Sequence, residues 1–163
     1  DTAAAGRLLT ALYIQSQPRQ LKHIVLDLDA TDDPLHGNQE GRFFHGYYGH
    51  YGYLPLYIFA GDQLLCVRPR PADIDAAAGV LEEVRRIVEQ LRRVWPDVEI
   101  LLRADGGFCR DQIMSWCENH GVDYVFGLAR NERLRRSIEE AMQEAGQKQQ
   151  QTGQATRVFT EFE

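Results

Sequence analysis

The sequence predicts an α/β domain built on one mixed sheet, and three observations support this fold class. The chain has 163 residues, which is the length of a single domain. Its composition, 44% hydrophobic and 26% charged, is typical of a protein with a sizeable core. A Gly-Asp turn between two apolar runs predicts a β-hairpin, and predicted helices then alternate with predicted strands. This order favours antiparallel and parallel strands within one sheet.

The first half of the chain is expected to hold one helix and the strands of the hairpin. Residues 2–14 have apolar side chains at helical spacing. The side chains expected to face the core from this helix are Leu8, Leu9, Leu12 and Tyr13. A buried strand is predicted at 23–28, followed by a polar, glycine-rich loop at 32–46. Aromatic strand sequence at 47–59 then turns into a second strand at 63–67.

Residues 73–95 form the clearest predicted helix, with Asp73 as N-cap and Pro96 as the stop. Two ion pairs at i,i+4 spacing are expected on it, Glu82 with Arg86 and Glu89 with Arg93. We therefore interpret the charged side chains of this helix as a solvated face. This interpretation covers Glu82, Glu83, Glu89, Arg85, Arg86, Arg92 and Arg93.

The remaining elements complete a five-stranded arrangement. Strands are predicted at 98–102 and 124–128, with a short helix at 110–120 between them. Beyond them we expect a helix from Asn131 to about Glu144, a loop at 146–154 and a further strand at 158–162. Five strands of which the first three are antiparallel, flanked by helices, make the ribonuclease H-like plan.

Acidic side chains mark the ends of two predicted strands. Asp27 and Asp29 are two residues apart, so they project from the same face of their strand. Asp105 ends a later buried strand and is followed by Gly106 and Gly107. Caps or solvated strand ends would explain a single aspartate, but two acid-tipped strands favour a ligand site, since α/β sheets place crevices at these ends. Carboxylates of this kind suit Mg²⁺ together with phosphate oxygens.

Four segments of the chain resemble the catalytic core of DDE transposases from bacterial insertion sequences. These segments are Ile24–Leu35 (IVLDLDATDDPL), Gly37–Leu56 (GNQEGRFFHGYYGHYGYLPL), Ile100–Phe108 (ILLRADGGF) and Tyr124–Arg133 (YVFGLARNER). The resemblance covers about residues 20–145. It implies a ribonuclease H-like enzyme that carries out DNA transposition by metal-dependent phosphodiester cleavage and strand transfer.

The resemblance also implies roles for individual residues. Asp29 matches the first catalytic aspartate and Asp105 the second, both as ligands of two Mg²⁺ or Mn²⁺ ions. Asp27 would either contact these ligands without binding the metal itself or have a structural role. Gly106 stands where the family often has serine. No glutamate matches the family's third acid, so we expect the single domain at 1–163 to be an N-terminal part of the core. We expect an insertion to start at about 146–163 and the fragment to be inactive alone.

DNA is the partner that the resemblance implies, both as transposon ends and as target, with a homodimer or larger assembly in the cytoplasm at the bacterial nucleoid. Arg103 projects to the same side as Asp105 and is the first candidate for a DNA-phosphate contact. The further candidates are Arg42, His45 and Arg130. The net charge of −6 gives no general basic field, so these contacts would be local. No apolar run reaches the length of a membrane span.

Two other functions remain open at this point. Asp27-Leu28-Asp29-Ala30-Thr31 fits DxDxT, the first motif of haloacid dehalogenase-like phosphatases, in which Asp27 would be the nucleophile. The one lysine after this motif, Lys148, lies in a glutamine-rich segment and does not suit the cation that such enzymes need. The second alternative is a degenerate, non-catalytic transposase remnant that only binds DNA or protein. The aromatic series at 43–57 is expected to serve the core and sheet surface, or else to stack on bases.

Overall fold

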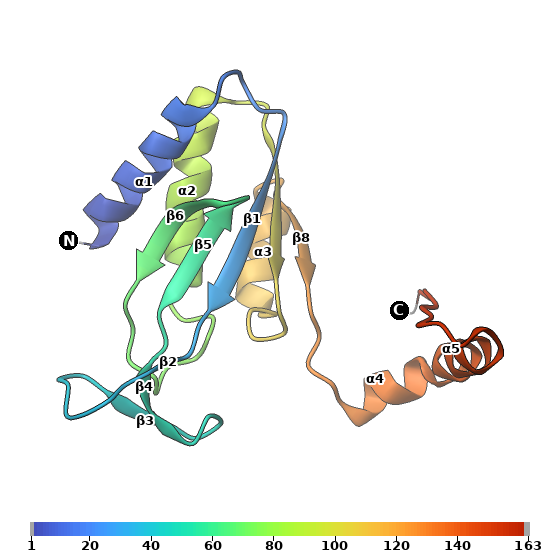
Figure 1. The fold of residues 1–163 in the computed structure, drawn as a ribbon. Helices are drawn as coiled ribbons and strands as arrows, with labels where there is room; N and C mark the ends of the chain where they lie inside the picture. Colours follow the sequence, from blue (N-terminus) through green and yellow to red (C-terminus); the bar gives the residue numbers. More distant parts are fainter. Residues whose placement is uncertain (1, 162–163) are drawn as a thin grey trace. The chain divides into compact units, whose positions relative to one another are not determined.

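The computed structural model describes residues 2–161 and divides the chain into two compact units (Figure 1). The first unit extends to Leu128 and the second begins at Ala129. Among the described residues, no helix combines the length and apolar character that crossing a membrane requires.

The first unit is built on a five-stranded sheet with the order β6-β5-β1-β7-β8. Its strands are β1 (His23–Ala30), β5 (Leu56–Ala60), β6 (Gln63–Arg68), β7 (Glu99–Ala104) and β8 (Asp123–Phe126). The central strand β1 is antiparallel to β5 and parallel to β7. The outer pairs continue this division, since β5 and β6 are antiparallel whereas β7 and β8 are parallel. The predicted ribonuclease H-like sheet, with its first three strands antiparallel, is confirmed.

Three helices cover one face of this sheet: α1 (Thr2–Ser16), α2 (Val80–Val94) and α3 (Asp111–Asn119) (Figure 1). The even-numbered residues Ile24, Leu26 and Leu28 of β1 join the core beneath the helices. The odd-numbered residues face the opposite side, which we call the open face, because side chains alternate along a strand. Val25 and Val125 are exposed on that face.

The helix α1 uses a different stripe from the one predicted. Its buried residues are Gly6, Thr10 and Tyr13, whereas Leu8 and Leu12 are 60% and 52% exposed. The reason is that α1 lies against β6 and α2. A Cβ on Gly6 would lie 2.7 Å from the Arg86 guanidinium, so this glycine leaves room for a side chain from α2. Three of the four residues predicted for the core are therefore not buried.

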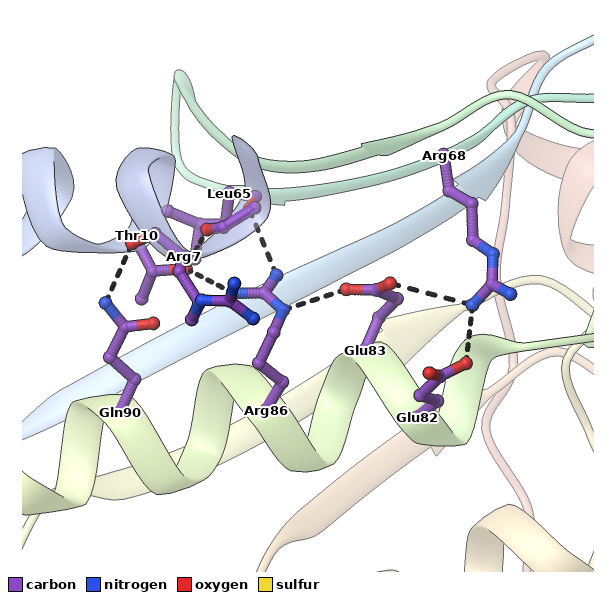
Figure 2. Close-up of polar contacts among 9 residues, drawn as sticks. Arg7, Thr10, Leu65, Arg68, Glu82, Glu83, Arg86 and Gln90 are labelled. Carbon is purple, nitrogen blue, oxygen red and sulfur yellow. Dashed lines mark hydrogen bonds and ion pairs between the residues drawn. The ribbon is translucent and has the colours of Figure 1, made fainter. Parts of the chain in front are cut away.

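A polar network joins α1, α2 and β6 (Figure 2). Arg86 donates to the Glu83 carboxylate at 2.9 Å, to Thr10 Oγ1 at 3.3 Å and to the Leu65 carbonyl at 3.5 Å. Glu83 is only 5% exposed, so the interpretation of this helix face as solvated is wrong for the pair. Glu82 pairs with Arg68 at 2.7 Å instead of with Arg86. The predicted pair of Glu89 and Arg93 is present, at 3.9 Å.

The helix α2 begins at Val80, later than predicted, and Gly79 rather than Asp73 is its N-cap residue. Gly79 has a φ of 73°, a left-handed conformation that glycine adopts without strain. The carbonyls of Ala76 and Ala78 accept hydrogen bonds from the buried Arg70 guanidinium. The preceding segment is thus a loop fixed by a side chain.

A small three-stranded sheet follows β1, where a loop was predicted. It consists of β2 (Asp33–Pro34), β4 (His50–Tyr53) and β3 (Phe43–His45), in that order and antiparallel. The predicted strand at 47–59 is divided into a turn, β4 and β5. A Cβ on Gly52 would lie 2.6 Å from the Asp33 carbonyl oxygen, so the approach of β2 to β4 requires glycine there.

The second unit contains the helices α4 (Glu132–Ser137) and α5 (Glu139–Thr152). Asn131 caps α4 as predicted, since its side chain accepts from the Leu134 amide at 2.9 Å. The expected loop at 146–154 is mostly helical, because glutamine and lysine are good helix formers. The strand predicted at 158–162 is not formed at 158–161, and Phe162 lies outside the described residues.

Candidate active site

Asp29 and Asp105 lie at the same ends of two neighbouring parallel strands. The register pairs Asp27 on β1 with Arg103 on β7, Asp29 follows two residues later within β1, and Asp105 directly follows the last residue of β7. Partners in adjacent strands project from the same face, and adjacent strands are about 4.8 Å apart. Both aspartates are exposed. The fold therefore brings the two strand ends that carry these aspartates to the same edge of the sheet.

Each of the two carboxylates is oriented by one short hydrogen bond. The Thr31 hydroxyl donates to Asp29 Oδ2 at 3.0 Å, and the Gly107 amide donates to Asp105 Oδ1 at 2.8 Å. Within residues 2–161, the second oxygen of each carboxylate accepts no hydrogen bond from a side chain, and both residues are exposed. Each aspartate can thus be held in place by one oxygen and offer the other to a cation.

Close backbone packing around Asp105 explains the glycines beside it. A Cβ on Gly107 would lie 3.0 Å from Asp105 Oδ1 and 3.2 Å from the Ala76 side chain. Gly127, which follows β8, would place a Cβ 3.0 Å from the Gly106 amide nitrogen. The Gly127 amide also donates to the Ala104 carbonyl at 3.0 Å. The turn that presents Asp105 is therefore fixed from two sides.

Asp27 and Arg103 form an ion pair across β1 and β7 on the open face. Arg103 binds both carboxylate oxygens of Asp27, with Nη2 at 2.9 Å from Oδ2. The hydrogen bond and the charge of Asp27 raise the pKa of the Arg103 guanidinium. The Arg103 side chain is exposed, and Arg103 precedes Asp105 by two residues. The ion pair occupies the Asp27 carboxylate and keeps the positive charge of Arg103 close to the strand ends that carry Asp29 and Asp105.

The remaining predicted DNA contacts are spread over the chain. Arg42 precedes β3, hydrogen-bonds to the Gly37 carbonyl and lies over the Tyr51 ring at 4.4 Å. His45, on β3, packs against the Tyr48 ring, and its Nδ1 atom is buried without a hydrogen bond. Arg130 belongs to the second unit.

Two residues near the site were not identified from the sequence. Asp32 binds His50 Nε2 at 2.9 Å and so joins the end of β1 to β4. Arg70 is 4% exposed and donates to the Leu54 carbonyl as well as to Ala76 and Ala78. Burial lowers the pKa of Arg70. Nothing in the sequence indicated that Arg70, which stands between two prolines, would be buried. The ion pair of Asp32 could have been suspected, because His50 lies in an aromatic strand that follows an acidic segment.

The donor set at the strand ends is incomplete for a metal site formed by protein alone. In the part of the chain that the structure describes, no three His, Cys, Asp or Glu side chains are grouped so as to hold a metal ion. Two carboxylate oxygens nevertheless fit Mg²⁺ or Mn²⁺, hard ions that take one or two carboxylates and fill the other positions with water and phosphate oxygens.

Comparisons with known proteins identify the family. No curated protein matches the sequence. Two solved structures with similarity are the Mos1 transposase paired-end complex with left transposon end (TM-score 0.42, 11% identity) and the Mos1 strand transfer complex (TM-score 0.41, 10% identity). Each alignment covers 99% of this chain, which spans 50% and 49% of those chains. The transposase DDE domain group 1 family matches residues 1–163. The chain therefore belongs to this family of DDE transposase domains.

Proposed function

We propose that this chain supplies two metal-binding aspartates, Asp29 and Asp105, to a transposase that cleaves DNA and joins its strands. The observation that carries the proposal is that two exposed aspartates stand at the same ends of the neighbouring parallel strands β1 and β7. Family membership supports DNA as the substrate. The reaction class is phosphodiester cleavage by water, followed by attack of a DNA 3′-hydroxyl.

The residues of the first unit have distinct tasks in this proposal. Asp29 and Asp105 would hold one or two Mg²⁺ or Mn²⁺ ions, which when bound activate the attacking oxygen and stabilise the leaving one. Thr31 and Gly107 keep the two carboxylates in their orientation. Arg103, held by Asp27, offers its exposed guanidinium to a DNA phosphate beside the carboxylates.

The family's chemistry uses a third acid, and we propose that it comes from a segment that the first unit does not contain. The same proposal places the beginning of an inserted segment at about residues 146–163 and treats the chain by itself as inactive. An assembly of at least two copies on DNA, with Arg42, His45 and Arg130 on phosphates, completes this proposal.

The phosphatase alternative is less compatible with the site. Its nucleophile would be Asp27, but both oxygens of this carboxylate are bound by Arg103. A remnant that only binds DNA or protein would make no use of two hydrogen-bonded carboxylates at the ends of neighbouring strands. The metal proposal accounts for both features.

Calorimetric titration of the 163-residue chain with Mn²⁺ tests the proposal. We expect weak binding that falls by at least about tenfold in Asp29→Asn and in Asp105→Asn, because each variant loses an anionic ligand. Asp62→Asn is the matched control, since Asp62 is an exposed aspartate in the turn between β5 and β6. Unchanged affinity in both site variants would contradict the proposal.

A further inference from the structure

The small sheet presents an unusual set of side chains, which we call the aromatic hairpin, residues 43–53. Every residue in this segment is Phe, Tyr, His or Gly. The exposed rings are Phe43, Phe44, Tyr47, Tyr48 and Tyr51. Tyr47, in the turn, is 87% exposed. Aromatic rings of this size are usually buried, so an accessible group of five indicates a binding surface.

The rings are held by one another and remain accessible. Phe44 and Tyr51 are cross-strand partners in an edge-to-face pair, with centroids 5.5 Å apart. The Arg42 guanidinium lies over the Tyr51 ring. In the turn, Tyr47 contacts Tyr48 edge-to-face at 5.0 Å. The hairpin thus offers ordered ring faces next to a cation.

The aromatic hairpin is directly connected to the candidate active site. Asp29 is followed by Thr31 and Asp32, and Asp32 binds His50 of the hairpin at 2.9 Å. The strand β2, which begins at Asp33, pairs with β4. Figure 1 shows the small sheet beyond the end of β1. Anything bound at Asp29 and Asp105 therefore lies near this hairpin.

We propose that the aromatic hairpin binds unpaired DNA bases by stacking, next to the site at which the DNA backbone is cut. This inference rests on the proposed function. Stacking needs accessible π faces and a nearby cation, and it tolerates any base sequence. The exposed side chains of the segment are rings, with no aliphatic residue among them, so stacking is the contact that this surface is best equipped to make. The segment itself has no acidic residue, and the adjacent Asp32 is paired with His50.

The test is photo-cross-linking of the full 163-residue chain to a single-stranded oligonucleotide that carries 5-iodouracil, at low salt and in EDTA. We expect cross-links at residues 43–53, found by peptide mass spectrometry. In parallel, fluorescence anisotropy should show an affinity about fivefold or more weaker in Tyr47→Ala and nearly unchanged in Tyr47→Phe, which keeps the ring. Phe159→Ala is the matched control, because Phe159 is an 88% exposed aromatic residue of the second unit.

The outcomes separate this inference from the metal proposal. EDTA removes divalent ions, so the cross-linking experiment does not depend on metal binding. Asp29→Asn should therefore cross-link as the native chain does, whether or not Mn²⁺ binds at Asp29. Unchanged affinity in Tyr47→Ala, or cross-links confined to other segments, would overturn the inference. Equal preference for duplex and single strands would do so as well. Self-association that is lost in Tyr47→Ala without any effect on DNA would assign the surface to a second copy of the chain instead.

Discussion

Arg86→Ala is expected to lower the free energy of unfolding by about 3–5 kcal/mol, because it leaves a buried carboxylate without its main partner. Glu83 is 5% exposed, and its other cation, Arg68, is further away at 3.6 Å. The variant also removes the contacts of Arg86 to Thr10 and Leu65 (Figure 2). Burial, and then the charge of Glu83, raise the pKa of the neighbouring Cys66 thiol to about 12, so this thiol stays neutral and supplies no charge.

Urea denaturation followed by circular dichroism measures this effect. Arg93→Ala is the matched control, since the Glu89–Arg93 pair is on the same helix but more than two-thirds exposed on both sides. The control should change stability by less than about 1 kcal/mol. The double variant Glu83→Leu with Arg86→Met should recover part of the loss, because no charge is then left buried. Equal effects of Arg86→Ala and Arg93→Ala would show that the buried network contributes no more stability than an exposed ion pair.

Arg70→Met is expected to destabilise the first unit by about 3 kcal/mol or more. The variant keeps most of the apolar volume but leaves the carbonyls of Leu54, Ala76 and Ala78 without their donor. An unsatisfied buried polar group costs about 1–3 kcal/mol. Among the described residues, Arg70 Nη2 is buried without a hydrogen-bond partner, so removing the guanidinium gives some relief, but we expect the three carbonyls left without a donor to outweigh it.

The same denaturation measurement applies, with Arg110→Ala as the control. Arg110 pairs with Asp75 in the loop that Arg70 holds, but its side chain is 44% exposed. We expect a change of less than about 1 kcal/mol for this exposed pair. Because Ala76 lies against Gly107, loosening of the loop in Arg70→Met should also weaken Mn²⁺ binding at Asp105. A stability equal to that of the native chain would mean that the loop is held by other contacts.

The sheet and the position of the two aspartates were predictable from the sequence, for a physical reason. Strands β1 and β7 are short apolar runs that end in acids, and this pattern is local. Parallel strands place their carboxyl ends at the same edge, so Asp29 and Asp105 follow from the order of elements. The turn at Gly61, which has a φ of 58°, was likewise predictable from neighbouring residues alone.

Other features depend on partners far away in the sequence. Glu83 is buried and paired with Arg86 at i,i+3 spacing, whereas the helical pattern alone pointed to Glu82 at i,i+4 spacing. Leu8 and Leu12 of α1 are exposed because the helix turns Gly6 toward α2, where the Arg86 guanidinium fills the space beside it. The small sheet was not found because β2 has only two residues, and its pairing depends on the close approach of Asp33 to Gly52.

The central claim, that Asp29 and Asp105 together hold a divalent cation, is tested most directly by NMR with Mn²⁺. Substoichiometric Mn²⁺ broadens the amide signals of residues close to it. We expect the signals of Asp29, Thr31, Asp105 and Gly107 to broaden together, and this effect to disappear in Asp29→Asn and Asp105→Asn but not in Asp62→Asn. Broadening at only one of the two strand ends, or centred on His45 and His50, would contradict the claim.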